Sequence, residues 1–297
     1  MLRIALPNKG RLADEARALF AEAGLGVRAL GERALTASLG GEFQALFVRA
    51  QDVAEFVADG AADAGVTGWD LVAESDRALE TLLDLEFGRC RLVVASHEES
   101  GIMSLDDITD HRVATVFPRL TRNYFESLGR PVSIVPVSGA AEVAPHLGIA
   151  DVIVDLVSTG STLKTNGLRE LGTVLESTAR LVGPKQGGFA ATVHDVTTAV
   201  PRSRESSLDD LVTALDSVVR GRGKRYLMAN VPRAVLDRVT AVLPGLNGPT
   251  VIDIMNGHDM VAVHAVVPAD GIYRTIAALK GLGAEGILVT RIERLLP

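Results

Sequence analysis

Short apolar runs alternate with segments of helical periodicity along most of this chain, and this alternation constrains the fold more than any other feature. LRIAL (2–6) is typical of a buried strand, and LADEARALFAEAG (12–24) has the spacing of an amphipathic helix that ends at a glycine. FQALFV (43–48) and ADAGVTG (62–68) continue the strand pattern. Because strands that alternate with helices usually form parallel units, the sequence predicts an α/β fold.

A second α/β set begins near CRLVVAS (90–96), and ARLV (179–182) is expected to return the chain to the first set. Two such lobes joined by crossing strands would enclose a cleft, a common place for a small ligand. The segment 183–207 mixes Gly, Pro and Ser with weak periodicity and is interpreted as partly linker. The predicted boundaries are 1–92 for lobe I, completed by about 181–207, then 93–180 for lobe II and 208–297 for a further domain.

The pattern changes in this last domain. After a predicted helix at 208–220, strands and helices follow in the order β-α-β-β-α-β, which is the ferredoxin-like unit. The predicted ranges are 224–230, 232–245, 250–255, 260–268, 270–283 and 285–296. Small domains of this shape often bind a regulatory ligand or mediate assembly.

The charge and cysteine content exclude several classes of protein. The formal net charge is −7 and no basic stripe is present, so a nucleic-acid partner is not expected. The single cysteine, Cys90, cannot form an internal disulfide, which favours a reducing compartment. The sequence shows neither a secretory signal nor a membrane-spanning run of about 18 apolar residues. We therefore expect a cytoplasmic protein with no membrane partner.

The stretch DVIVDLVSTGSTLKTNGL (151–168) combines acid and hydroxyl groups at the end of a strand. Asp151 and Asp155 have the even spacing that places both on one strand face, and we expect both at the carboxyl end, where α/β folds bind ligands. The loop after them offers backbone N–H groups, hydroxyls and a glycine to an anion, from Ser158, Thr159, Gly160, Ser161 and Thr162. Carboxylates for vicinal hydroxyls beside a phosphate loop fit a ribose 5-phosphate; the alternative is a capped helix after a strand.

Basic residues follow two other predicted strands. PNKGRL (7–12) places Lys9 and Arg11 at a strand-to-helix turn, and Arg49 follows the strand 43–48. These cations predict a diphosphate site, whereas ordinary surface charge is the alternative. Asp70 in VTGWDL (66–71) lies at another such turn, where a helix cap is a sufficient explanation. The six histidines have no metal-ligand spacing, so no metal-ligating residues are predicted.

These pieces together resemble a known family. EVAPHLGIADVIVDLVSTGSTL (142–163), with PNKGRL, VTGWDL and ATVFPRLTRNYF (114–125), resembles the ATP phosphoribosyltransferase of histidine biosynthesis. YLMAN (226–230) and LPGLNGPTV (243–251) are similar to its long form, which carries a regulatory domain. The resemblance implies a two-lobed, periplasmic-binding-protein-like catalytic core plus a C-terminal ferredoxin-like (ACT-like) regulatory domain.

The resemblance also implies an activity. Such an enzyme condenses ATP with 5-phosphoribosyl 1-pyrophosphate (PRPP) to give N1-(5-phosphoribosyl)-ATP and pyrophosphate, with Mg2+ as cofactor. Asp151 and Asp155 match positions that hold the ribose hydroxyls, and residues 158–162 match the loop around the 5-phosphate. Asp155 is also assigned to catalysis, together with three basic positions that face the phosphates, Lys9, Arg11 and Arg49.

Further residues follow from the same resemblance. Asp70, Phe117 and Arg11 are expected at the ATP site, although relatives often carry Tyr where Phe117 stands. Long-form relatives are homo-oligomers, from dimer to hexamer, that L-histidine inhibits. The candidate histidine-binding residues are Asn230, Leu246 and Thr250.

Two other hypotheses remain at this point. A two-lobed small-molecule binding protein without catalysis would share the hinged α/β plan. A regulatory subunit that senses an amino acid would use the ferredoxin-like domain but has no use for the ribose-phosphate loop. A phosphoribosyl transfer needs positioning and electrostatics rather than a covalent nucleophile, and no general base can be named from the sequence.

Overall fold

The computed structural model describes residues 1–28, 34–185, 204–255 and 259–296. The chain divides into two compact units, Met1–Val212 and Thr213–Pro297. The helix α6 (Arg204–Gly221) runs through the division. Most of the predicted linker at 183–207 lies outside the described residues, and the predicted domain boundaries remain predictions.

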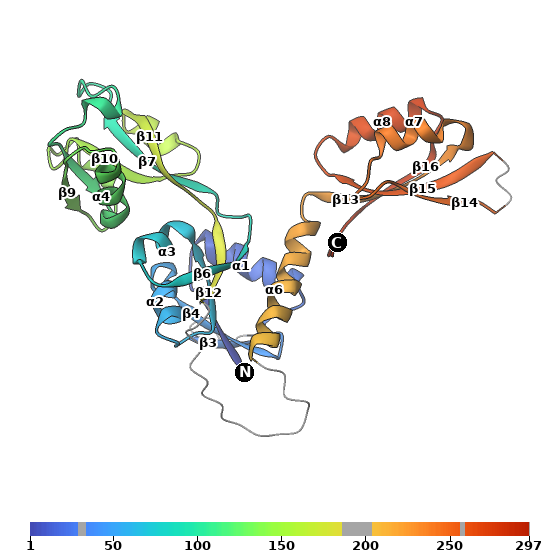
Figure 1. Cartoon of the computed structure of the whole chain (residues 1–297), viewed down its shortest axis with the longest axis horizontal. Coiled ribbons are helices and arrows are strands. Elements are labelled where there is room, and N and C mark those ends of the chain that lie inside the picture. The colour runs from blue at the N-terminus through green and yellow to red at the C-terminus, as the bar shows by residue number, and fades with distance from the viewer. Residues whose placement is uncertain (29–33, 186–203, 256–258, 297) are drawn as a thin grey trace. The chain divides into compact units, whose positions relative to one another are not determined.

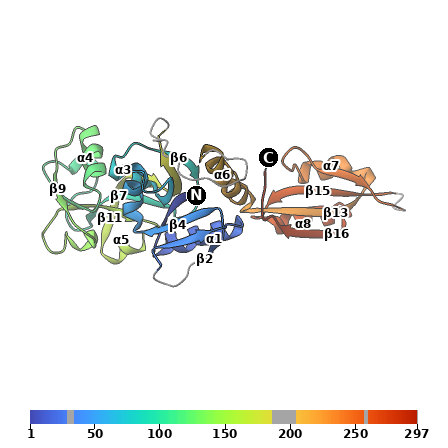
Figure 2. The same ribbon diagram turned by 90° about the horizontal axis from the view of Figure 1, so that it is seen from below.

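Lobe I of the first unit is built on a seven-stranded sheet of order β2-β3-β4-β1-β5-β12-β6. Its strands are β1 (Leu2–Pro7), β2 (Val27–Arg28), β3 (Thr36–Leu39), β4 (Phe43–Val48), β5 (Ala64–Gly68), β6 (Leu79–Asp84) and β12 (Ala179–Pro184). Its helices are α1 (Arg11–Glu22), α2 (Val53–Ala58) and α3 (Trp69–Ser75). The central strands β1, β4 and β5 are parallel, so their carboxyl ends share one edge of the sheet. The helix α1 lies beside this sheet (Figure 2).

Lobe II is built on a five-stranded sheet of order β11-β7-β10-β8-β9. Its strands are β7 (Cys90–His97), β8 (Arg112–Thr115), β9 (Ser133–Pro136), β10 (Val152–Val157) and β11 (Leu168–Ser177). Its helices are α4 (Pro118–Ser127) and α5 (Ser161–Thr165). Apolar side chains from both faces of β7 and β10 fill two separate clusters, as expected for strands covered on both sides.

Two segments cross between the lobes, one from β6 to β7 and one from β11 to β12 (Figure 1). They are hydrogen-bonded to each other: the Leu85 N–H donates to the Ala179 carbonyl at 3.0 Å, and the Ala179 N–H donates to the Phe87 carbonyl at 2.9 Å. Because β12 pairs with β5 and β6, the chain returns to the sheet of lobe I. The two lobes are therefore joined by a paired double crossing.

The C-terminal unit has a four-stranded antiparallel sheet of order β14-β15-β13-β16. Its elements are β13 (Lys224–Pro232), α7 (Leu236–Val242), β14 (Thr250–Asp253), β15 (Met260–Pro268), α8 (Ile272–Gly281) and β16 (Glu285–Arg291). Alternate residues of β13 and β15 are buried in a cluster that includes Val239 of α7 and Leu279 of α8, so the two helices cover one sheet face. The predicted fold class, a two-lobed α/β core followed by a ferredoxin-like domain, is confirmed.

Candidate active site

The loop after β10 forms a small pocket. It begins at Ser158 and leads into α5, and Gly160 between them adopts a φ of 78°. This left-handed conformation favours glycine because a side chain would be strained there. The pocket has a volume of about 80 Å³ and is lined by Glu142, Asp155 and residues 156–163. The structure therefore brings Asp155 together with all five predicted loop residues.

Asp155 lies in β10 with its carboxylate partly buried. Burial raises the pKa of this carboxyl, a hydrogen bond from the Leu156 N–H at 2.8 Å lowers it, and the charge of Glu142 raises it. Two carboxylates thus face one pocket. Such a pair can accept hydrogen bonds from the two vicinal hydroxyls of a ribose.

Glu142 is a site residue that the sequence reasoning missed. The helical spacing of 139–148 predicts a helix, and this prediction is wrong: the structure has only a 3-10 turn at Ala141–Val143 followed by turns. Pro145 has no N–H and so cannot continue a helical ladder. Glu142 is the first residue of the motif EVAPHLGIADVIVDLVSTGSTL (142–163), and its place in that motif was the one sequence feature that could have indicated a role in the site.

Asp151 does not lie where the sequence predicted. The expectation that it shares the carboxyl end of the strand with Asp155 is wrong, because Asp151 directly precedes β10 and lies at its amino end. The two residues are about 13 Å apart along the strand. The Arg112 side chain donates to both carboxylate oxygens of Asp151, at 3.2 and 2.8 Å, and this hydrogen bonding lowers the pKa of Asp151. The Asp151 carboxylate is therefore engaged in a structural ion pair with Arg112.

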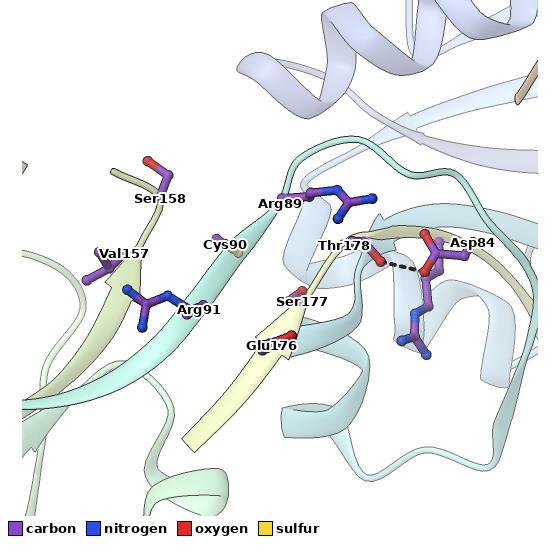
Figure 3. Close-up of a pocket in the computed structure, with 10 residues that line it drawn as sticks. Asp84, Arg89, Cys90, Arg91, Val157, Ser158, Glu176, Ser177 and Thr178 are labelled. Carbon is purple, nitrogen blue, oxygen red and sulfur yellow. Dashed lines mark hydrogen bonds between the residues drawn. The ribbon is translucent and has the colours of Figure 1, made fainter. Parts of the chain in front are cut away.

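A larger cavity of about 400 Å³ lies between the lobes beside the double crossing (Figure 3). It shares Val157 and Ser158 with the loop pocket, so the two hollows adjoin. The rest of its lining comes from β6, β7, β11, β12 and the segments that join them: Asp84, Arg89, Cys90, Arg91, Glu176, Ser177, Thr178 and Arg180. A ligand held at the loop could extend into this cavity.

Three arginines line this cavity, and none was predicted from the sequence. Arg91 forms an ion pair with Glu170. The Arg180 guanidinium lies over the Trp69 ring, 4.1 Å from its centroid, and its Nη1 donates to the Thr81 hydroxyl at 3.2 Å. Its buried Nε has no hydrogen-bond partner among the described residues. The lining holds three guanidinium groups and two carboxylates, Asp84 and Glu176, and the guanidinium groups are the donors that it can offer to an anion.

The predicted basic residues of lobe I come from one sheet edge. β1 and β4 pair in parallel with Pro7 opposite Val48, so Lys9, Arg11 and Arg49 all follow the same edge. Burial and the charge of Asp70 raise the pKa of Cys90, while a hydrogen bond with Ser177 and the charge of Arg11 lower it. Arg11 is therefore near the cavity that Cys90 lines.

Asp70, the next predicted site residue, is buried at the start of α3, with 5% of its surface exposed. Its carboxylate accepts a hydrogen bond from the Ser177 hydroxyl at 2.5 Å, and its N–H donates to the same oxygen at 3.0 Å. Burial raises the pKa of Asp70, and the bond from Ser177 lowers it. Asp70 therefore reaches the cavity through Ser177, whose contribution the sequence did not reveal.

Phe117 precedes α4 and is only 3% exposed, packed in an apolar cluster of lobe II. The Thr121 hydroxyl donates to its carbonyl at 2.7 Å. The ring is enclosed by this packing, and the expected place of Phe117 at the ATP site stays a prediction. Its physical role here is core packing at the end of β8.

Two comparisons decide the family. The family model for ATP phosphoribosyltransferase matches residues 49–201, and the model described as the HisG C-terminal domain matches residues 221–294. An ATP phosphoribosyltransferase of Gemmatimonas aurantiaca is 67% identical over 305 residues, with 100% of both chains covered. The chain belongs to the ATP phosphoribosyltransferase family. The resemblance found in the sequence is confirmed, and the chain is an enzyme, a transferase of histidine biosynthesis.

Other comparisons agree with this family. The ATP phosphoribosyltransferase of Methanococcoides burtonii is 45% identical, with 100% of both chains covered. A solved structure described as the ATP phosphoribosyl transferase (HisG:HisZ) complex from Thermotoga maritima has a TM-score of 0.61 and 27% identity, and covers 74% of this chain and 99% of that chain. Family membership sets aside the hypotheses of a non-catalytic binding protein and of a purely regulatory subunit.

The C-terminal unit of this ATP phosphoribosyltransferase family member carries the three candidate histidine-binding residues. Asn230 lies on β13 opposite Ala262, and Thr250 lies on β14 opposite His264. Both belong to the sheet face that α7 and α8 leave uncovered: Asn230 alternates with buried residues of β13, and Thr250 pairs with His264, which alternates with buried residues of β15. Leu246 lies in the loop before β14 and is 52% exposed. The structure thus brings Asn230 and Thr250 to one face, with β15 between them.

Two further observations on the described part of the chain concern metal binding and membrane-spanning helices. Within it, no three His, Cys, Asp or Glu side chains converge closely enough to hold a metal ion by themselves. Among its helices, none has both the length and the apolar character needed to cross a membrane.

Proposed function

We propose that the chain joins ATP to PRPP and releases pyrophosphate, giving N1-(5-phosphoribosyl)-ATP, the first step of histidine synthesis. One observation carries this proposal: a pocket of carboxylates, hydroxyls and loop N–H groups adjoins a cavity lined by arginines. The first suits a ribose 5-phosphate, and the second suits the phosphates of a nucleotide or a departing diphosphate.

The loop pocket holds the ribose in this proposal. Asp155 and Glu142 accept hydrogen bonds from the two ribose hydroxyls, while residues 158–162 surround the 5-phosphate. Asp151 is left out of this set, because Arg112 occupies its carboxylate at the far end of the strand. The ribose would then lie with its C1 atom toward the larger cavity, which begins at Ser158.

Electrostatic stabilisation supplies the catalysis. Cleavage of the C1–O bond builds positive charge on the ribose and negative charge on pyrophosphate. The partly buried Asp155 stabilises the first, and Lys9, Arg11 and Arg49 stabilise the second, while Arg89 and Arg180 face the phosphates of ATP. Adenine N1 attacks with its own lone pair, so no covalent nucleophile is needed, and the two lobes hold both substrates in place. Asp70 and Arg11 belong to the ATP-binding site in this proposal.

Mg2+ is the proposed cofactor. This ion prefers one or two carboxylates together with substrate phosphates over a cage of protein ligands, which fits the donors present. Asp155 and Glu142 are the carboxylates that would hold it beside the diphosphate of PRPP. When bound, the ion would neutralise charge on the phosphates.

Regulation and assembly belong to the C-terminal unit in this proposal. L-histidine would bind at Asn230, Leu246 and Thr250 and inhibit the enzyme. The uncovered sheet face with exposed Ile252 and Leu288 supports a homo-oligomer, from dimer to hexamer. The structural relative from Thermotoga maritima is itself described as a complex. The single cysteine and the substrates favour a cytoplasmic location.

The ultraviolet absorbance change on mixing the full-length protein with ATP, PRPP and Mg2+ tests the function. Pyrophosphatase is present to pull the reaction forward, and the assay runs with and without L-histidine. We expect a rise that needs both substrates and falls with histidine. A rise indifferent to histidine would remove the regulatory part, and no rise with PRPP bound would overturn the reaction.

A further inference from the structure

Ser177 ends β11 and lines the cavity between the lobes (Figure 3). Its hydroxyl makes two hydrogen bonds with one residue of lobe I. It donates its proton to Asp70 Oδ1 at 2.5 Å, and it accepts from the Asp70 N–H at 3.0 Å. Ser177 and Asp70 are both almost fully buried. The serine is therefore fixed in position and in the direction of its O–H bond.

A serine hydroxyl has one proton to donate and two lone pairs that accept. The proton and one lone pair of Ser177 are committed to Asp70. Turning the O–H bond toward a ligand would leave the buried Asp70 carboxylate without its hydroxyl donor, which is costly in a desolvated site. Ser177 consequently offers the cavity one acceptor and no donor.

Ser177 is 4% exposed, and its side chain is also within hydrogen-bonding reach of the Cys90 thiol. Cys90, which also lines the cavity, is the cross-strand neighbour of Ser177 in the pairing of β7 with β11. A thiol is only a weak donor and can rotate away. An N–H or O–H group of a ligand would make a stronger bond to the same oxygen than the thiol does.

The proposed substrates narrow the choice of ligand group. Both substrates also carry hydroxyl donors: those of PRPP are held at the loop pocket in the proposed function, and ATP has two ribose hydroxyls besides the 6-amino group of adenine, which is the only N–H group of either substrate. This step rests on the proposed function. We propose that Ser177 accepts a hydrogen bond from the 6-amino group of ATP and thereby selects adenine among purines. A 6-oxo purine would place a carbonyl oxygen, itself an acceptor, opposite the Ser177 acceptor, and no hydrogen bond could form.

The same contact would position the nucleophile. N1 is adjacent to the 6-amino group on one edge of adenine, so an anchored amine fixes the direction of the N1 lone pair. The cavity that holds Ser177 also reaches Ser158 at the ribose-phosphate loop. Asp70 contributes through Ser177 and is a positioning residue.

The test compares two nucleotides that differ only at this group. Calorimetry measures the dissociation constants of ATP and of purine riboside 5′-triphosphate, in which hydrogen replaces the amine. The wild-type chain is expected to bind ATP about tenfold more tightly, the usual effect of one buried hydrogen bond. Ser177→Ala is expected to bind both nucleotides alike, with only ATP weakened, whereas Ser177→Thr keeps the hydroxyl and the preference.

Ser96→Ala is the matched control. Ser96 is also fully buried and donates to the Ile102 carbonyl at 2.8 Å, but it does not line the cavity. This variant should keep the wild-type preference, and thermal unfolding of both alanine variants monitors the fold. Equal weakening of both nucleotides in Ser177→Ala, or a wild type without preference, would overturn the inference.

The turnover assay separates this inference from the proposed function. A wild type that forms product but shows no preference between the two nucleotides refutes only the role of Ser177. A wild type that prefers ATP but forms no product with PRPP refutes the reaction and leaves the acceptor in place.

Discussion

Glu74 and Arg119 cap each other's helices across the two lobes. The Glu74 carboxylate, near the end of α3, accepts from the N–H groups of Arg119 and Leu120 in the first turn of α4, both at 2.9 Å. The Arg119 guanidinium donates to the Ala73 carbonyl at 3.2 Å and pairs with Asp76 at the end of α3. Negative charge thus meets a helix N-terminus and positive charge meets a helix C-terminus. This contact fixes α3, and with it Asp70, relative to lobe II.

Replacement of Glu74 by alanine should destabilise the first unit. Two N–H donors of α4 would lose their acceptor, and a cap of this kind contributes about 0.5–2 kcal/mol. Urea unfolding followed by circular dichroism measures the change in the free energy of unfolding. Glu126→Ala is the control, because Glu126 is an exposed glutamate on the same helix. Equal stabilities of the two variants would show that the contact between the lobes contributes nothing.

The two aspartates of the β10 segment should differ in their effect on activity. Asp155→Asn removes a charge from the ribose pocket and is expected to lower kcat/KM for PRPP at least about 100-fold, since a desolvated charge acts on the reacting centre. Asp151→Asn changes the same chemical group at the other end of the strand, and near-normal kcat/KM is expected. Steady-state kinetics with varied PRPP measures both. A large loss in Asp151→Asn would return Asp151 to the ribose site.

The outcome for these residues shows what local sequence can predict. The loop from Ser158 to Thr162 was predictable because strand, glycine and hydroxyls are neighbours in the chain. The shared face of Asp151 and Asp155 follows from the two-residue period of a strand, but the residue at which β10 begins depends on pairing with β7 and β8. No local pattern contains that information.

Residues that meet only through the tertiary fold were missed for the same reason. Arg89 and Arg180 lie far apart in the sequence and line one cavity because the two crossing segments pair with each other. Ser177 meets Asp70 across 107 positions of the chain. The β-α-β-β-α-β order was predictable in full, because each of its elements carries its own periodicity.

Asp151 should make stability depend on pH. Its pKa in the folded chain lies below the ordinary value of 3.8, mainly because of its hydrogen bonds from Arg112. The stabilisation is therefore fully present above that ordinary value and is lost as pH falls through the folded pKa. Asp151→Asn should lower the free energy of unfolding by about 1 kcal/mol or less at neutral pH, because the pair is partly exposed to solvent.

Urea unfolding of wild type and Asp151→Asn over a pH series measures this difference. We expect the two curves to converge on the acid side of the folded pKa. Arg112→Gln removes the partner and should reproduce the loss at neutral pH. A difference between wild type and Asp151→Asn that stays constant down to strongly acidic pH would exclude the ion pair as its cause.

Trp69 should report on occupancy of the cavity. It is the only tryptophan of the chain, and its ring lies under the Arg180 guanidinium, which lines the cavity. An anion bound by Arg180 would alter the field and the contacts at the indole ring. Titration with ATP should therefore change the tryptophan emission, whereas Trp69→Phe should give no such signal. Emission that stays unchanged at ATP concentrations shown by calorimetry to be saturating would separate Arg180 from the nucleotide site.

Arg180→Gln tests whether the Arg180 guanidinium contributes to the free energy of ATP binding. A hydrogen bond from a charged donor contributes about 1.5–3 kcal/mol, so this variant should bind ATP roughly 10–100-fold more weakly. Arg130→Gln is the control, because Arg130 pairs with Asp106 in lobe II and does not line the cavity. Unchanged ATP affinity in Arg180→Gln would mean that the guanidinium only covers Trp69. Weaker binding there, with Arg130→Gln unaffected, would identify Arg180 as an anion-binding group that contacts the nucleotide from lobe I.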